Sequence, residues 1–200
     1  MTQSAYCLFE TTLGWCGIAW IGPGDSDIPP AVTIFQLPEA TAAMTESRLA
    51  RLRGARPASA LPPPIAEVIE RVRLHLEGEV QDFRDVQVVL DAAGPFERLV
   101  YEAARNIPPG KTKTYGEIAK AIGQPAAAQA VGQALGRNPI PLIIPCHRVL
   151  AAGGKPGGFS APGGLATKAR LLAGEGVTFA PATTKAKRDA GQAPTLFDAV

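Results

Sequence analysis

A cysteine followed by a histidine and an arginine is the most reactive combination in the sequence. Cys146, His147 and Arg148 come directly after the apolar run Ile143-Ile144-Pro145. A thiolate is a strong nucleophile, and neighbouring positive charge lowers the pKa of a thiol. Adjacent side chains of an extended segment point to opposite sides, so His147 reaches Cys146 only through a turn or a bridging water. A buried, unreactive cysteine beside a structural histidine is the alternative that this spacing leaves open.

Other chemistries that need fixed spacings are not indicated. His75 and His147 are the only histidines, and no set of residues has the spacing of a zinc site, so we expect no metal and no cofactor. Gly110-Lys111-Thr112 resembles the end of a P-loop, but Arg105 stands where that motif requires its first glycine. The glycines of residues 153–164 do not follow the dinucleotide-binding pattern either.

Composition indicates a protein of the cytoplasm. The 200 residues are 46% hydrophobic, which is enough for a core. No apolar run is long enough to span a membrane, and the start resembles no signal peptide. Three cysteines are an odd number, which fits a reducing compartment better than a disulfide scaffold.

Charge is divided unevenly along the chain. Residues 1–100 carry 8 Lys and Arg against 13 Asp and Glu, whereas residues 101–180 carry 9 against 3. This asymmetry favours contact between the second part and a polyanion, with an ordinary solvated surface as the alternative.

The first part of the chain predicts a small α/β domain, residues 1–92, without visible chemistry. Residues 5–20 predict a hairpin that turns at Leu13-Gly14. Strands are expected at Val32–Leu37 and Val86–Leu90, and helices at Ala40–Arg53 and Pro64–Gly78. Pro57–Pro64 is a proline-rich break between the helices. Cys7, Cys16 and His75 are interpreted as core or surface filler.

The second part, residues 93–180, predicts a mostly helical domain. Helices are expected at Phe96–Asn106, Tyr115–Ile122, Ala126–Leu135 and Thr167–Gly174, with a glycine-rich loop or lid over residues 151–164. Thr114 and Glu117 form a capping box at the start of the second helix. The second and third helices, joined by Gly123-Gln124-Pro125, indicate a helix-turn-helix, although such pairs are also common in plain helical packing. Residues 181–200 are predicted to be a disordered tail.

At this point the residues match a known family. The segment from Asn138-Pro139 through Ile144-Pro145-Cys146-His147-Arg148-Val149, with Tyr115 and the helix pair before it and Gly163-Gly164, Lys168, Leu171-Leu172 and Glu175-Gly176 after it, resembles the O6-alkylguanine-DNA alkyltransferases. The close match covers roughly residues 94–177, and residues 1–90 are only compatible. The resemblance implies an α+β protein, with a ribonuclease H-like N-terminal domain before the helical domain.

The resemblance also implies a mechanism, DNA repair by irreversible, single-use transfer of an alkyl group from O6-alkylguanine to Cys146. His147 would act through a water to keep Cys146 as a thiolate, and Glu175 would orient His147. Asn138 would brace the turn before the active-site segment, and Tyr115 would donate to the departing guanine. Arg148 is interpreted as structural. The lesion pocket implied is lined by Leu135, Pro141, Val149, Phe159 and Ser160.

The alkyl carbon cannot be reached inside a stacked duplex, so the nucleotide must be flipped out. The family lays its small-faced recognition helix in the minor groove, with little sequence dependence. The DNA contacts implied are Tyr115, Ala127, Ala128, Gln129 and Arg137. The sequence departs from the family where Gln129 replaces an arginine that fills the gap left by the flipped base, where Phe159 replaces a tyrosine, and in a slightly longer loop.

Two other functions compete with repair. A non-enzymatic lesion sensor of the same fold would lack the acceptor cysteine, so Cys146 argues against it. A transcriptional regulator would need side chains that read bases, which the Ala- and Gly-rich helix does not supply. We further expect a monomer that is associated with the nucleoid when it is bound to DNA. In the tail, we expect a peptide that docks into a sliding clamp, Gln192–Phe197.

Overall fold

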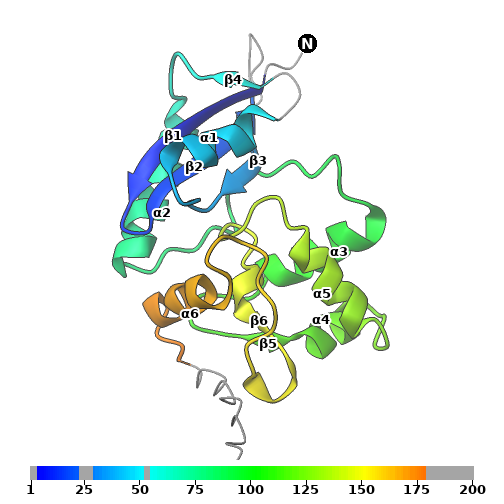
Figure 1. The fold of residues 1–200 in the computed structure, drawn as a ribbon. Coiled ribbons are helices and arrows are strands. Elements are labelled where there is room, and N and C mark those ends of the chain that lie inside the picture. The colour runs from blue at the N-terminus through cyan, green and yellow to red at the C-terminus, as the bar shows by residue number, and fades with distance from the viewer. Residues whose placement is uncertain (1–3, 23–28, 52–54, 179–200) are drawn as a thin grey trace, which may run out of the picture.

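The computed structural model describes residues 4–22, 29–51 and 55–178. The predicted tail and its clamp-docking peptide lie outside these residues, as does the last part of the helix predicted over 40–53. The described chain is α+β, as predicted, with a sheet and two helices in the N-terminal part and mostly helices in the C-terminal part (Figure 1).

The N-terminal sheet has four strands in the order β3-β2-β1-β4. Its strands are β1 (Ser4–Thr11), β2 (Gly14–Ile21), β3 (Ala31–Gln36) and β4 (Ala55–Pro57). The predicted hairpin is confirmed: β1 and β2 pair antiparallel, and Gly14 has a φ of +119° at the turn. β3 pairs antiparallel with β2, and β4 pairs parallel with β1.

Alternate residues of the strands face two different layers, as the two-residue period of a strand requires. Tyr6 and Ala19 pack with Leu49 of α1 (Ala42–Ala50) on one side. On the other side, Phe9 and Ile18 join the main core together with the apolar stripe of α2 (Pro63–Glu77). The helical spacing predicts a stripe of Ile65, Val68, Ile69, Val72 and Leu76. The first four are buried, and Leu76 is partly buried against the same core.

The C-terminal part holds four helices around short strands and turns (Figure 1). They are α3 (Pro95–Arg105), α4 (Tyr115–Ala121), α5 (Ala128–Gly136) and α6 (Gly164–Gly174). Between α5 and α6 lie the 3-10 turns η1 (Cys146–Arg148) and η2 (Ala152–Gly154) and the strand β6 (Val149–Leu150), which pairs parallel with β5 (Lys113–Thr114). The predicted capping box is confirmed: Thr114 Oγ1 accepts from the Glu117 amide, and Glu117 Oε2 accepts from the Thr114 amide at 2.7 Å.

Three predicted elements need correction. The strand predicted at Val86–Leu90 is wrong, because only Val88 forms a bridge, to Val32, and the segment otherwise runs as a connection. The helix predicted from Ala126 begins at Ala128, after a turn in which the Ala127 amide donates to the Gln124 carbonyl. The helix predicted from Thr167 begins three residues earlier, at Gly164, where Gly163 adopts a φ of +78°.

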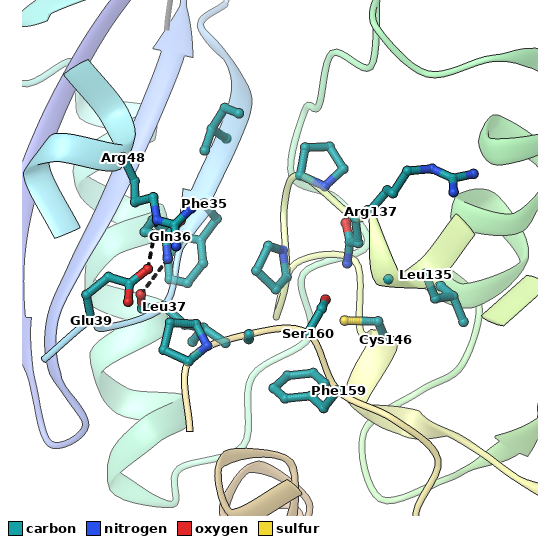
Figure 2. A pocket seen from close by; sticks show the side chains of 17 residues that line it. Phe35, Gln36, Leu37, Glu39, Arg48, Leu135, Arg137, Cys146, Phe159 and Ser160 are labelled. Atoms are coloured by element: carbon teal, nitrogen blue, oxygen red, sulfur yellow. Dashed lines mark hydrogen bonds and ion pairs between the residues drawn. The ribbon is translucent and has the colours of Figure 1, made fainter. Parts of the chain in front are cut away.

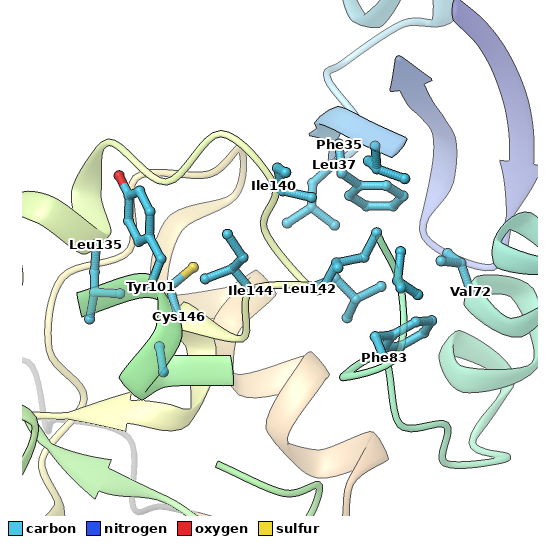
Figure 3. Packing of buried hydrophobic residues seen from close by; sticks show 14 of the residues in the cluster. Phe35, Leu37, Val72, Phe83, Tyr101, Leu135, Ile140, Leu142, Ile144 and Cys146 are labelled. Atoms are coloured by element: carbon cyan, nitrogen blue, oxygen red, sulfur yellow. The ribbon is translucent and has the colours of Figure 1, made fainter. Parts of the chain in front are cut away.

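One hydrophobic cluster joins the two parts of the molecule (Figure 3). Phe35 and Leu37 from the sheet side, Phe83 from the connection, and Ile140 and Leu142 from the segment after α5 are all at most 3% exposed. This shared core fixes the N-terminal sheet against the segment that leads to Cys146. No helix in the described part of the chain is long and apolar enough to cross a membrane.

Candidate active site

The segment before Cys146 is held in a tight, braced conformation. Asn138 Nδ2 donates to the Ile144 carbonyl (2.8 Å), and Asn138 Oδ1 accepts from the Ile140 amide (3.0 Å). Leu142, 1% exposed, has a φ of +74°, the one non-glycine residue of the described chain in this conformation. Such a conformation costs of order 1–3 kcal/mol and persists only where packing enforces it. The predicted role of Asn138 as a brace for this turn agrees with these contacts.

Cys146 begins a 3-10 turn, so it and His147 do not lie on a plain extended strand. Such a turn is one of the two arrangements by which adjacent residues can cooperate, the other being a bridging water. Cys146 is 8% exposed, and His147 is completely buried.

A buried carboxylate, Glu175, is the centre of the polar network behind Cys146. His147 Nε2 lies 2.9 Å from Glu175 Oε1. Arg148 donates to both carboxylate oxygens, from Nε at 2.9 Å to Oε2 and from its terminal nitrogen at 2.7 Å to Oε1. The Gly110 amide donates to Oε2 at 3.3 Å. Arg148 also donates to the Ile107 carbonyl (2.7 Å), so it ties this loop as the sequence predicts.

The hydrogen bond to Glu175 assigns the proton of His147. Because Glu175 has several donors and is ionised, Nε2 of His147 must carry a hydrogen to donate to it. The other ring nitrogen, Nδ1, is buried and has no hydrogen-bond partner among the described residues. A buried acceptor without a partner is costly. Nδ1 of His147 is thus an unoccupied base in the residue that follows Cys146 in the sequence.

Burial opposes the charged form of each ionisable group in the site. Burial raises the pKa of the Cys146 thiol, opposed by a hydrogen bond from Asn138 and the charge of Lys168. Burial lowers the pKa of His147, opposed by Glu175. The pKa of Glu175 lies far below its usual range because both neighbouring imidazoles and Arg148 donate to it, which outweighs its burial. Burial thus opposes the thiolate that the family resemblance implies, whereas Asn138 and Lys168 favour it.

Cys146 lies where two cavities meet. One, of about 400 Å³, opens between the sheet and the C-terminal part, and Figure 2 shows Cys146, Ser160 and Phe159 beside it opposite Gln36 and Arg48. The other, of about 540 Å³, lies between α5 and the loop after η2, and Tyr115 and Gln129 line it. A reactive atom at such a junction can contact two parts of one ligand.

The loop after η2 covers the second cavity and contacts Tyr115. Tyr115 Oη donates to the Gly158 carbonyl at 3.5 Å. A Cβ on Gly157 would lie 2.6 Å from the Tyr115 ring, so a larger residue there would displace Tyr115. Burial and the charge of Cys146 both raise the pKa of Tyr115, which keeps its hydroxyl protonated as a donor. The predicted lid therefore lies close to the predicted guanine donor.

The structure brings most of the predicted lesion and DNA residues together. Leu135, Pro141, Phe159 and Ser160 line the cavities at Cys146, as do Tyr115, Ala128 and Gln129 of the predicted DNA surface. Ala127 and Val149 line neither cavity. Arg137 forms an ion pair with Glu97 (2.8 Å), which it would have to leave to contact a phosphate.

Two residues of the site carry no assigned role from the sequence. Lys168 is fully buried and donates to the Val149 carbonyl at 2.6 Å, and burial lowers its pKa to about 8. His75, interpreted as core or surface filler, is buried, and its Nε2 also lies 3.2 Å from Glu175 Oε1. It could not be found from the sequence, because 100 positions separate the two residues and no spacing links them. Within the described ranges, no cluster of three or more His, Cys, Asp or Glu could hold a metal ion.

Comparison with known proteins identifies relatives for this arrangement. Residues 95–177 match the family described as 6-O-methylguanine DNA methyltransferase, DNA binding domain. A methylated-DNA–protein-cysteine methyltransferase of Mycolicibacterium paratuberculosis is 41% identical over 138 residues, which are 68% of this chain and 74% of the relative. A second one, from Methanosarcina acetivorans, is 44% identical over 110 residues, 55% of this chain and 68% of the relative.

Solved structures agree with the sequence relatives. The Mycobacterium tuberculosis OGT in complex with DNA is 31% identical, with a TM-score of 0.66 over 86% of this chain and 93% of that one. The O6-methylguanine-DNA methyltransferase of Pyrococcus kodakaraensis is 29% identical, with a TM-score of 0.62 over 88% of this chain and 100% of that one. With its cysteine, histidine and carboxylate in place, the chain belongs to the methylated-DNA–protein-cysteine methyltransferase family.

Proposed function

We propose that this protein repairs DNA by moving a methyl or larger alkyl group from O6 of guanine to Sγ of Cys146. The observation that carries the proposal is the buried set Cys146, His147 and Glu175, in which Nδ1 of His147 is left free to take a proton. Membership of the family supports the same reaction.

The step is an in-line displacement at the alkyl carbon. The bond from Sγ to carbon forms while the bond from carbon to O6 breaks, and the guanine leaves as an anion. The thiol proton passes to Nδ1 of His147, through a water, and Glu175 stabilises the imidazolium that results. Tyr115 donates to the guanine and neutralises it. A thioether has no route back to a thiol here, so each molecule reacts once.

The two cavities at Cys146 divide the lesion between them. The guanine would enter the cavity beside α5, where Tyr115, Gln129 and Ser160 lie on its wall. The alkyl group would extend toward the cavity lined by Leu135, Pro141 and Phe159. The implied contact between the Val149 carbonyl and the guanine amino group would require that buried carbonyl, which accepts from Lys168, to become open to the cavity.

The DNA would be held along the minor groove by α4 and α5, acting as a helix-turn-helix. The pair is joined by a turn with Gly123 at a φ of +76°, and Ala127, Ala128 and Gln129 lie at the start of α5. Small side chains allow close approach to the groove. Gln129 would hydrogen-bond the base left unpaired by flipping, without the guanidinium plane of an arginine. Arg137 would contribute after exchanging Glu97 for a phosphate.

The finer organisation follows the sequence predictions. Residues 1–92 would form a ribonuclease H-like domain, supported by three antiparallel strands, a helix and a strand parallel to the first. Residues 93–180 would carry DNA binding and alkyl transfer. We expect the protein to act as a monomer.

A stoichiometric repair assay tests the proposed function. A duplex with one O6-methylguanine is mixed with the protein, and the conversion of that base to guanine is followed by chromatography of the digested DNA. We expect one base repaired for each protein molecule, and none with Cys146→Ala. Tight binding to the lesion without repair would instead indicate a lesion sensor.

Docking of Gln192–Phe197 into a sliding clamp stays a prediction from the sequence. Deletion of residues 190–200 should weaken binding to the clamp and leave repair unchanged. Equal clamp binding by the full and shortened chains would end the idea.

A further inference from the structure

A second histidine reaches the carboxylate behind the reactive cysteine. His75 lies near the end of α2, in the N-terminal part, and is 3% exposed. Its Nε2 is 3.2 Å from Glu175 Oε1, the same oxygen that accepts from His147. Its ring packs against Phe83 in an edge-to-face arrangement, with ring centres 5.5 Å apart. The alkyl-transfer mechanism does not use this residue.

The protonation of His75 is fixed by its other neighbour. The backbone amide of Gln81 donates to Nδ1 of His75 at 3.1 Å, so Nδ1 is an acceptor. A neutral imidazole has one donor and one acceptor, so the hydrogen is on Nε2, which lies 3.2 Å from Glu175 Oε1. His75 is thus a neutral donor in a fixed orientation.

The remaining partners of Glu175 all come from the C-terminal part. They are His147, Arg148 and the Gly110 amide. Arg148 donates to both carboxylate oxygens, whereas His75 contacts Oε1 alone, from the opposite part of the molecule. Among the described residues, His75 is the one side chain of the N-terminal part in ion-pair distance of this carboxylate.

We propose that His75 is a positioning residue for alkyl transfer: its Nε2–H holds Oε1 of Glu175 in the place from which that oxygen orients His147. The N-terminal part, through α2, thereby takes part in activating Cys146 as well as supporting the fold. The proposal rests on the proposed function, because it assigns His75 to the same reaction.

Two substitutions separate a hydrogen-bond role from a packing role. His75→Leu keeps an apolar side chain of similar size and removes the donor. His75→Gln offers an amide N–H near the position of Nε2. Val72→Ala, one turn earlier on α2 and fully buried, is the control for lost stability, since Val72 contacts the sheet core and not Glu175.

Two readouts are measured on each full-length variant at a temperature where it is folded. One is the rate constant of methyl transfer from a duplex containing O6-methylguanine. The other is the pH at which half of Cys146 reacts with a small uncharged alkylating reagent, which follows the ionisation of the thiol.

We expect His75→Leu to transfer roughly ten-fold more slowly and its half-reaction pH to rise by about one unit, since one pKa unit is a factor of ten. His75→Gln should stay within about two-fold of the wild type, because a donor hydrogen bond to a charged group is restored. Val72→Ala should melt earlier with both readouts unchanged.

Three results would overturn the proposal. The first is a His75→Leu variant that transfers the methyl group at the wild-type rate. The second is a His75→Leu variant that transfers faster, which would mean that His75 only competes with His147 for Oε1. The third is an equal loss of transfer rate in the His75→Leu and His75→Gln variants. If the wild type itself transfers no methyl group, the proposed function fails instead, and the pH profile of Cys146 still tests the contact with His75.

Discussion

Replacing Glu175 by glutamine removes the charge on which the whole site depends. Glu175→Gln keeps the size of the side chain but leaves Arg148 buried without its anion and His147 without a carboxylate to stabilise its protonated form. Breaking a buried ion pair costs about 3–5 kcal/mol of stability. Losing a hydrogen bond to a charged group costs about 1.5–3 kcal/mol in the transition state, which corresponds to a rate lower by roughly ten- to 150-fold.

The assay is a single-turnover transfer from a labelled O6-methylguanine duplex, run below the melting temperature of the variant. Asp85→Asn is the matched control, because it breaks the exposed ion pair with Arg71 (2.8 Å), away from Cys146. It should cost at most about 1 kcal/mol and leave transfer unchanged. A folded Glu175→Gln protein that transfers at the wild-type rate would refute the role of the carboxylate.

Three further predictions concern the lid, pH and the helix cap. Gly157→Ala should slow methyl transfer by roughly ten- to 100-fold, because the added methyl group displaces Tyr115. Gly174→Ala, where a Cβ would meet no atom, is the control in the same kinetic assay. Equal rates for the two variants would contradict the prediction. The pKa values of His147 and Glu175 are lower in the folded protein than in the unfolded chain, so the unfolded chain binds more protons. The free energy of unfolding, measured with urea, should therefore fall as pH drops below about 6.5 and again below about 4.3. A flat pH profile would contradict this. Thr114→Ala should lower the free energy of unfolding by about 1 kcal/mol through loss of the α4 cap, and an unchanged urea midpoint would oppose it.

Local signals in the sequence predicted local structure well. The capping box of Thr114 and Glu117, the turn at Gly14 and the apolar stripe of α2 each depend on residues within one or two turns of each other. The Cys146 motif was informative because its neighbours in sequence are also its neighbours in the site. Family resemblance added Glu175, which lies 28 residues after His147.

Features set by tertiary packing could not be predicted in this way. Val86–Leu90 has the composition of a strand, but it meets the sheet at one bridge only, so no ladder forms. His75 has no local feature that distinguishes it from a core histidine, and only the folded chain brings it to Glu175. The pKa of Cys146 is likewise raised by burial among distant segments, which no local pattern in the sequence predicts.

The most direct test of the account is the intact mass of the protein after mixing with a duplex that contains O6-methylguanine. We predict that every active molecule gains the mass of one methylene group, that peptide mapping places the methyl group on Cys146, and that Cys146→Ala gains nothing. An unchanged mass with the lesion in excess, or a methyl group on Cys7 or Cys16, would contradict the central claim.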